Sequence, residues 1–320
     1  MKYLRLSVFL LLLAALPARA QDFPSKEIRF LCGFSPGGTC DLLSRILAEH
    51  LTPIFGQRVL VENRTGASGI IAADTVAKAA PDGHTVYLAT MALHTILPVM
   101  PGVPIPFNID RDVTPIANVA NIYNMLVVRP DAPFRTVEEM IAYGRANPGR
   151  LTYASAGNGT SQHLSGEYFK RITGLEILHV PYRGGAPAIV DIVAGRTDMM
   201  FGNMPEFLGQ IRGGGLRPLA FGAPRRSPLF PELPLINQTL PEFEIRNWFG
   251  IAGPGNLPPA IVNRWTEALQ RVGADPAFQR RMTENGMEMI IGSQAEFLET
   301  IRADRGRWGN VIRDANIRAD

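Results

Sequence analysis

The sequence predicts an α/β fold with open, largely parallel sheets divided between two domains. Short apolar segments alternate with helix-like segments along most of the chain, which is the pattern of open parallel α/β sheets. The chain has 320 residues, and roughly 300 without its first segment are enough for two domains of ordinary size. Two helical segments close the chain without a domain of their own, so we expect them to pack back on the first domain.

The expected strands are short apolar runs bounded by turn residues. They lie at 28–34, 58–63, 85–90, 123–130, 151–155, 176–182, 197–203, 216–222 and 245–254. The expected helices have apolar residues at helical spacing. They lie at 40–56, 70–80, 136–149, 159–174, 186–195, 205–215, 258–276 and 293–315. The proline-rich stretch 97–116 is expected to be irregular surface chain.

This order of elements predicts an inserted domain. Residues 123–247 would form domain 2, and residues 21–122 together with 248–320 would form a discontinuous domain 1. The chain would cross between the domains twice, near Asn121–Tyr123 and near Arg246–Trp248.

The first twenty residues have the pattern of an export signal. Lys2 and Arg5 precede a short apolar core, and Ala18-Arg19-Ala20 gives a small-x-small cleavage pattern, so we expect cleavage after Ala20. The chain has 32 Lys+Arg and 29 Asp+Glu, and the signal carries three basic residues and no acid, which leaves 29 of each sign. This neutral balance gives no indication of a nucleic-acid partner.

The chain has two cysteines, Cys32 and Cys40. An exported protein can oxidise them. However, one is expected in a strand and the other in the first turn of the next helix, which need not bring them within bonding reach. We therefore expect two reduced, largely buried thiols.

Small polar loops follow the expected strands at the edge where open α/β sheets bind ligands. Two of them, Ser35–Thr39 and Ser155–Thr160, are glycine-rich and open directly into helices. Glycine allows close backbone approach, and a helix N-terminus offers free N–H groups and partial positive charge. Each loop alone fits an ordinary helix start, but two such loops, one from each domain, favour an anion-binding cleft.

Enzymatic motifs are missing from these loops. Neither loop has the Gly-Lys-Ser/Thr ending of a phosphate loop or a dinucleotide fingerprint, and the five histidines show no metal-ligand spacing. We expect His163 to hold its loop by hydrogen bonding, with ligand contact as the alternative, and Asp41 to suit the helix dipole or to orient the loop. Asp191 and Asp198 are interpreted as structural, and Arg183 as either a carboxylate partner or rim charge.

Four stretches in order resemble the Bug-type receptors of the tripartite tricarboxylate transporter family. They are "FPSKEIRFLCGFSPGGTCDLLSRILAEHL", "VENRTGASGIIAADTVAKAAPDGHTVYLAT", "LTYASAGNGTSQHLSGEYFK" and "HVPYRGGAPAIVDIVAGRTDMMF". The resemblance implies a two-lobed, type II-like periplasmic binding fold that closes on a small carboxylate. Ser35 and the two cysteines depart from the family pattern, which leaves the identity of the ligand open.

The resemblance also implies the site and the partners. The predicted ligand-binding residues are Phe34, Ser35, Pro36, Gly37, Gly38, Thr39, Asp41, Thr90, Met91, Ser155, Gly157, Asn158, Gly159, Thr160, Ser161, His163, Tyr182, Arg183 and Asn203. We expect a periplasmic monomer with no cofactor, no metal and no catalytic residue, which passes its solute to transporter membrane subunits. A signalling receptor and a secreted α/β enzyme are the alternatives. A Gly159→Val change is expected to block the binding loop without affecting the fold.

Overall fold

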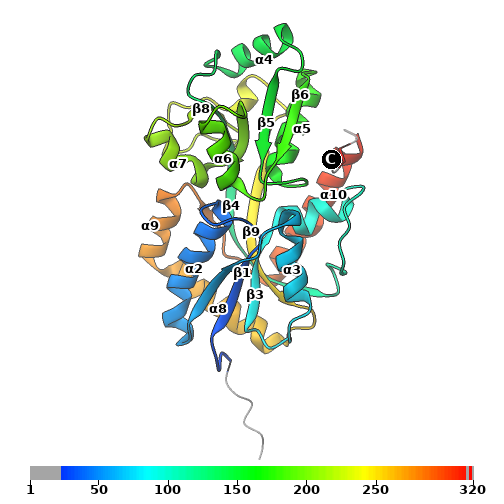
Figure 1. Ribbon diagram of the computed structural model, residues 1–320. Coiled ribbons are helices and arrows are strands. Elements are labelled where there is room, and N and C mark those ends of the chain that lie inside the picture. The colour runs from blue at the N-terminus through cyan, green and yellow to red at the C-terminus, as the bar shows by residue number, and fades with distance from the viewer. Residues whose placement is uncertain (1–22, 315–316, 319–320) are drawn as a thin grey trace, which may run out of the picture.

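Ten strands form one mixed sheet that runs through two lobes of the computed structural model, which describes residues 23–314 and 317–318 (Figure 1). The strands are β1 (Ile28–Cys32), β2 (Val59–Asn63), β3 (Thr85–Thr90), β4 (Val113–Val128), β5 (Leu151–Ser155), β6 (Ile177–Pro181), β7 (Met199–Asn203), β8 (Arg217–Phe221), β9 (Arg246–Pro254) and β10 (Glu288–Met289). Their order is β2-β1-β3-β9-β4-β7-β5-β6, with β8 and β10 also paired to β4. The prediction of an α/β fold is confirmed.

Helices cover both lobes of this sheet. They are α2 (Thr39–Phe55), α3 (Ile70–Ala77), α4 (Val137–Ala146), α5 (Ser161–Thr173), α6 (Gly185–Val193), α7 (Met204–Arg212), α8 (Pro259–Ala274), α9 (Pro276–Glu284) and α10 (Gln294–Asp314). The C-terminal helices α8 and α9 pack beside α2 in the lobe that holds β1 to β3, which we call lobe 1 (Figure 1). Lobe 2 holds β5 to β8 with α4 to α7.

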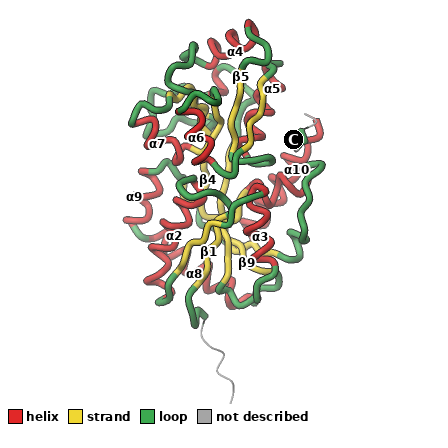
Figure 2. Tube along the Cα trace, in the orientation of Figure 1, coloured by secondary structure: helices red, strands yellow, loops and turns green. Residues whose placement is uncertain are grey.

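Strands β4 and β9 connect the two lobes, and the strands in Figure 2 can be followed from one lobe into the other. Within lobe 1, β1 pairs in parallel with β2 and β3, and within lobe 2, β5 pairs in parallel with β6 and β7. The connecting strands are antiparallel to each other, from Val113 opposite Pro254 to Tyr123 opposite Arg246. From Asn124 onward β4 pairs with β7 instead, so its partners change between Tyr123 and Asn124. The domain boundaries expected from the sequence stay a prediction.

The start of β4 differs from the prediction. The stretch 97–116 was expected to be irregular, but β4 begins at Val113 and includes Pro115. The register shifts between Pro115 and Ala117, which fits the confinement of proline to strand edges and bulges. The sheet can therefore take up this proline without losing the strand.

The core is continuous across the connecting strands. One cluster of buried side chains extends from Leu31 and Tyr87 in lobe 1 to Phe169 and Phe201 in lobe 2. Trp248, fully buried at the start of this connection, donates its Nε1–H to Asp304 of α10 at 2.7 Å. A buried indole N–H needs such a partner, so α10 is fixed against the junction of the lobes.

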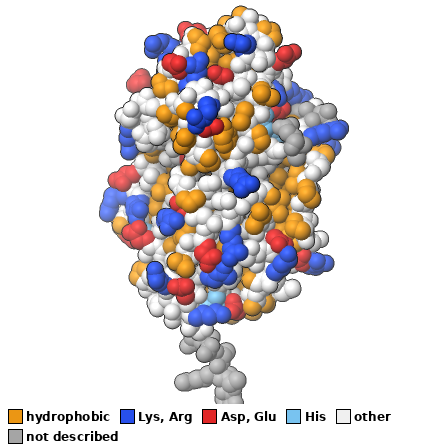
Figure 3. All heavy atoms as spheres, in the orientation of Figure 1, with side chains coloured by type: hydrophobic (Ala, Val, Ile, Leu, Met, Phe, Trp, Pro, Cys, Tyr) orange, Lys and Arg blue, Asp and Glu red, His pale blue; other side chains and the backbone are white. Residues whose placement is uncertain are grey.

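The predicted export signal, residues 1–20 with cleavage after Ala20, lies outside the described residues. Among the described helices, none has the length and apolarity required to cross a membrane. On the face shown in Figure 3, basic and acidic side chains are interspersed over both lobes.

Candidate functional site

A pocket lies between the lobes, beside the connecting strands. Loops that follow β1 and β3 form its lobe 1 side, and the starts of α5, α6 and α7 form its lobe 2 side. Its lining residues are Phe34, Gly38, Thr39, Cys40, Thr90, Ala92, Ala156, Thr160, Ser161, Gln162, Gly185, Asn203, Glu206, Asn247 and Phe249. The strand ends of both lobes therefore meet at one site, as the sequence predicted for an open α/β fold.

The first glycine-rich loop carries the chain from β1 into α2. Gly37 has φ +84°, which favours glycine, and its N–H donates to Asp41 Oδ2 at 3.1 Å. Burial of Asp41 opposes its ionisation, but hydrogen bonds from Arg45 and from the Gly37 N–H lower the pKa of its carboxyl below the usual value. Asp41 thus orients the loop from behind and does not line the pocket.

A disulfide joins the two ends of this loop, so the prediction of two reduced thiols is wrong. Cys32 and Cys40 are bonded, with their Cα atoms 6.0 Å apart. The separation is short because α2 begins at Thr39, where the turn has folded back beside the end of β1. Both cysteines are buried, as expected.

The second loop, between β5 and α5, is held by its own side chains. Ser155 Oγ lies 2.7 Å from His179 Nε2 and accepts the Gly157 N–H at 3.1 Å. The Gly159 N–H donates to His163 Nδ1 at 3.1 Å, which is the loop-holding role expected for His163. Ser155 and His163 lie behind the pocket lining.

Thr160 caps α5 and brings the helix N-terminus to the pocket. Its side chain accepts the His163 N–H, and its hydroxyl donates to the Gly157 carbonyl at 2.7 Å. Thr160, Ser161 and Gln162 line the pocket. The first N–H groups of a helix have no acceptor within the helix, so this end of α5 can bind an anion.

Gly159 faces lobe 1 instead of the pocket. It has φ +73°, and a Cβ at this position would lie 2.2 Å from Leu97 Cδ2. A Gly159→Val substitution would therefore require Leu97 to move, and the expectation that it leaves the fold unaffected stays a prediction.

The segment after β3 forms a wall of the pocket. Thr90 and Ala92 line it, whereas Met91 is fully buried in the core. Ala92–Ile96 forms a π-helix, a form that often occurs at functional sites.

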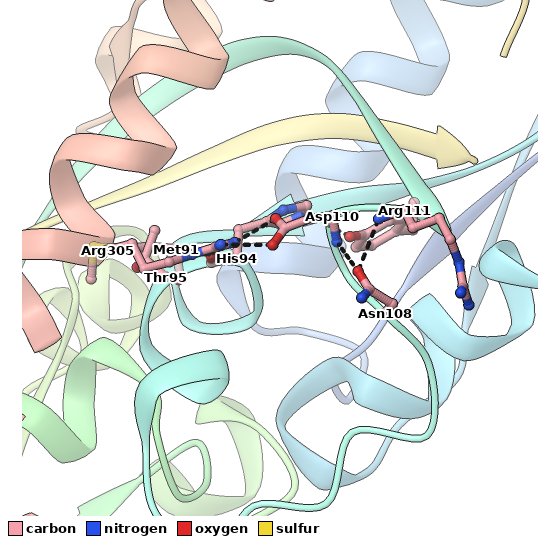
Figure 4. Close-up of polar contacts among 8 residues, drawn as sticks. Met91, His94, Thr95, Asn108, Asp110, Arg111 and Arg305 are labelled. Atoms are coloured by element: carbon pink, nitrogen blue, oxygen red, sulfur yellow. Dashed lines mark hydrogen bonds and ion pairs between the residues drawn. The ribbon is translucent and has the colours of Figure 1, made fainter. Parts of the chain in front are cut away.

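Arg305 of α10 fixes this wall from outside. It donates to the His94 carbonyl at 2.9 Å and to both carboxylate oxygens of Asp110 at 2.9 Å (Figure 4). The imidazole of His94 is buried beside the Tyr87 hydroxyl, at 2.6 Å, and burial lowers its pKa to about 3. His94 is therefore a neutral structural residue.

Two further helices begin at the pocket. Gly185 opens α6, and Asn203 precedes α7, where its N–H donates to Glu206 Oε1 at 2.8 Å. Asn247 of β9 donates its side-chain amide to Asn203 Oδ1 at 3.1 Å. Together with α2 and α5, four helix N-termini face one pocket, and no lysine, arginine or histidine of the described part of the chain lines it.

The predicted site residues thus fall into three groups. Those that line the pocket are Phe34, Gly38, Thr39, Thr90, Thr160, Ser161 and Asn203. Those that line an adjacent hollow, which shares Phe34 and Ala156 with the pocket, are Gly157, Asn158, Tyr182 and Arg183. The remainder support or border the loops, and they are Ser35, Pro36, Gly37, Asp41, Met91, Ser155, Gly159 and His163.

Contacts between the lobes involve two residues of these loops. Ser35 donates its hydroxyl to the Arg183 carbonyl at 2.9 Å, while the Arg183 side chain is exposed.

The two aspartates near α6 form hydrogen bonds within lobe 2. Tyr182 donates to Asp191 at 2.5 Å, and Asp198 accepts from the N–H and hydroxyl of Thr152. Both aspartates are thus structural, as expected.

Sequence reasoning missed several lining residues, above all Gln162, Glu206 and Asn247. Glu206 follows Asn203 in the spacing of a capping box, which gives an ordinary reason for its presence and no sign of a pocket. Among the described residues, no group of three or more His, Cys, Asp or Glu side chains could hold a metal ion.

Comparison with known proteins gives a consistent result. The family model for the tripartite tricarboxylate transporter family receptor matches residues 43–317. Protein BugT of Bordetella pertussis is 34% identical over 311 residues, 95% of this chain and 94% of its own. The R. palustris protein Rpa4515, solved with adipate, has a TM-score of 0.90 at 32% identity, covering 93% of this chain and 99% of its own. MatC of Rhodopseudomonas palustris, solved with bound malate, has a TM-score of 0.86 at 26% identity, covering 91% and 100%.

Proposed function

The chain belongs to the tripartite tricarboxylate transporter receptor family, and on this premise we propose that it binds a small carboxylate between its lobes and delivers it to a membrane transporter. The observation that carries this proposal is the convergence of four helix N-termini on a pocket without basic side chains. Helix N-termini bind anions through backbone N–H groups and partial positive charge. The solved relatives Rpa4515 with adipate and MatC with malate support the class of ligand.

The mechanism that fits this geometry is closure of the lobes on the solute. A ligand that contacts both lobes stabilises the arrangement in which they meet, because only that arrangement gives it all of its contacts. Within this proposal the receptor acts as a periplasmic monomer, its contact with the transporter is transient, and no bond of the solute is made or broken.

Thr39 offers a direct test of the site. Its hydroxyl is buried at the start of α2, lines the pocket and has no hydrogen-bond partner among the described residues. A buried polar group without a partner is costly, so a ligand oxygen is the natural partner for it. Thr197 is a matched control, because its hydroxyl is equally buried and unpartnered but lies outside the pocket.

The experiment is a thermal-shift screen of the unfolded and refolded protein against mono- and dicarboxylates. A ligand at 100 times its Kd stabilises the folded state by about 2.7 kcal/mol. We expect Thr39→Val to weaken binding of the acid found at least fivefold and Thr197→Val to leave it unchanged. A protein that no carboxylate stabilises, or equal binding by both variants, would contradict this site.

A further inference from the structure

Among the described residues, Glu206 is the only ionisable side chain that lines the pocket, since Cys40 is in the disulfide. Most of the lining consists of backbone, hydroxyl, amide and aromatic groups. A carboxylate in a pocket built from helix N-termini competes with an anionic ligand for the same partial positive charge.

Hydrogen bonds fix the orientation of this carboxylate. Oε1 accepts the Asn203 N–H at 2.8 Å and the Gln162 side-chain amide at 2.7 Å. Gln162 is itself held, because its Oε1 accepts the Ala156 N–H at 2.6 Å. One oxygen of Glu206 is thus fully engaged on lobe 2.

The other oxygen, Oε2, faces the helix starts of both lobes. A Cβ on Gly185 would lie 1.9 Å from Oε2, so the start of α6 must be a glycine for this side chain to fit. A Cβ on Gly38, at the start of α2, would lie 3.9 Å from the same atom. The Thr39 N–H of lobe 1 also forms a hydrogen bond with this carboxyl group. Glu206 Oε2 therefore lies close to the starts of both α2 and α6.

We propose that Glu206 determines the specificity of the receptor, by favouring carboxylates that also carry an ammonium or another N–H donor and by disfavouring dicarboxylate dianions. This inference rests on the proposed function. The carboxylate of such a ligand would bind at the start of α5 and the Thr39 hydroxyl, and its donor group would contact Glu206 Oε2. A dianion would instead place a second negative charge beside Glu206 with no basic side chain in the lining to compensate it.

Titration of Glu206 gives the selectivity a pH dependence. Burial raises its pKa to about 7, against the opposing hydrogen bonds from the Asn203 and Thr39 N–H groups. Within the part of the chain that the structure describes, no other titratable group faces it from the lining on α2, α5, α6 or β9. Asp41, which follows the first loop, is engaged by Gly37 and Arg45 behind the loop. Binding of a cationic acid should therefore strengthen as the pH rises through about 7, and binding of a dianion should weaken.

The test uses four probes with the same four-carbon chain, namely butanoate, succinate, 2-aminobutanoate and 4-aminobutanoate. Affinities are measured by titration calorimetry between pH 6 and 8.5 for the mature protein, for Glu206→Gln and for Glu176→Gln. The glutamine is isosteric and keeps an acceptor for Asn203 and Gln162. Glu176 is an exposed glutamate of the same lobe and provides the control.

We expect one of the amino acids to bind the parent protein at least tenfold more tightly than succinate at pH 8. Glu206→Gln should abolish or reverse this preference, and Glu176→Gln should retain it. The same rank order and pH profile in all three proteins would overturn the inference and leave the proposed function standing. Absence of binding by these probes and by every acid of the thermal-shift screen would overturn the proposed function itself.

Discussion

Replacing Glu206 by glutamine should stabilise the ligand-free protein at alkaline pH and have little effect at acid pH. The reason is the different environment of its carboxyl group in the folded and unfolded states. Burial between the lobes raises the pKa from the ordinary value of 4.5 to about 7. The folded protein therefore binds this proton more tightly than the unfolded chain does.

The magnitude follows from linkage between protonation and folding. Below pH 4.5 the carboxyl is neutral in both states, and its favourable contribution to folding is fully present. That contribution is lost as the pH rises through the folded pKa of about 7, and the difference amounts to about 3 kcal/mol. Glutamine does not titrate, so the stability gained by the variant should appear between pH 4.5 and 7 and then stay constant.

Thermal unfolding of both proteins from pH 4.5 to 8.5 measures this difference. At about 2.1 cal/mol/K per residue for roughly 300 residues, 3 kcal/mol corresponds to a Tm difference of about 5 °C at pH 8. The buried His94, with its pKa lowered to about 3, destabilises both proteins equally as the pH falls and cancels in the comparison. A Tm difference that is constant with pH, or largest at acid pH, would refute the reasoning.

Three further changes probe the loops and the wall of the site. Replacing Cys32 and Cys40 by serine should lower the free energy of unfolding by about 2.5 kcal/mol, which is the loop-closure entropy for their separation of 8 residues. The Tm of this variant should not respond to reductant, and two free thiols in the untreated parent would contradict the prediction. Arg305→Ala should lower the free energy of unfolding in urea by about 1–3 kcal/mol, because the His94 carbonyl loses its donor. A variant of parental stability would show that the wall of the pocket does not depend on Arg305. Gly159→Ala should lower the free energy of unfolding by about 1–3 kcal/mol. A double-mutant cycle with Leu97→Ala should show coupling, and strict additivity would rule out a close contact between positions 159 and 97.

Much of the fold follows from local sequence, and the exceptions have a common cause. Glycine-rich turns followed by helical spacing located α2 and α5 within a residue or two. The early part of β4 was missed because a proline and polar residues interrupt its apolar pattern, while pairing with β9 stabilises it. The helix α9 was missed because Pro276 looks like a helix end, but Asp275 caps a new helix that begins at this proline.

The site could be predicted where it depends on single loops and not where it depends on pairs of distant segments. Thr39 and Thr160 follow strands directly, so strand-end reasoning places them at the pocket. Asn247 and Glu206 reach the pocket only because β9 and α7 are brought together at the junction of the lobes. The disulfide was missed for a different reason, because whether a strand end and the next helix start lie within bonding reach depends on the conformation of the turn between Cys32 and Cys40.

The side-by-side arrangement of β4 and β9 has a mechanical consequence. Two adjacent, hydrogen-bonded strands resist sliding and stretching but can bend and twist together, so they leave the lobes few degrees of freedom relative to each other. The closure proposed above would then be a rotation about this pair of strands, and little orientational entropy would be lost when a solute is bound. Asn247 lies in this pair and lines the pocket, so a solute bound there would lie next to the axis of this rotation. A small displacement beside the axis would become a large movement at the far rims of the lobes.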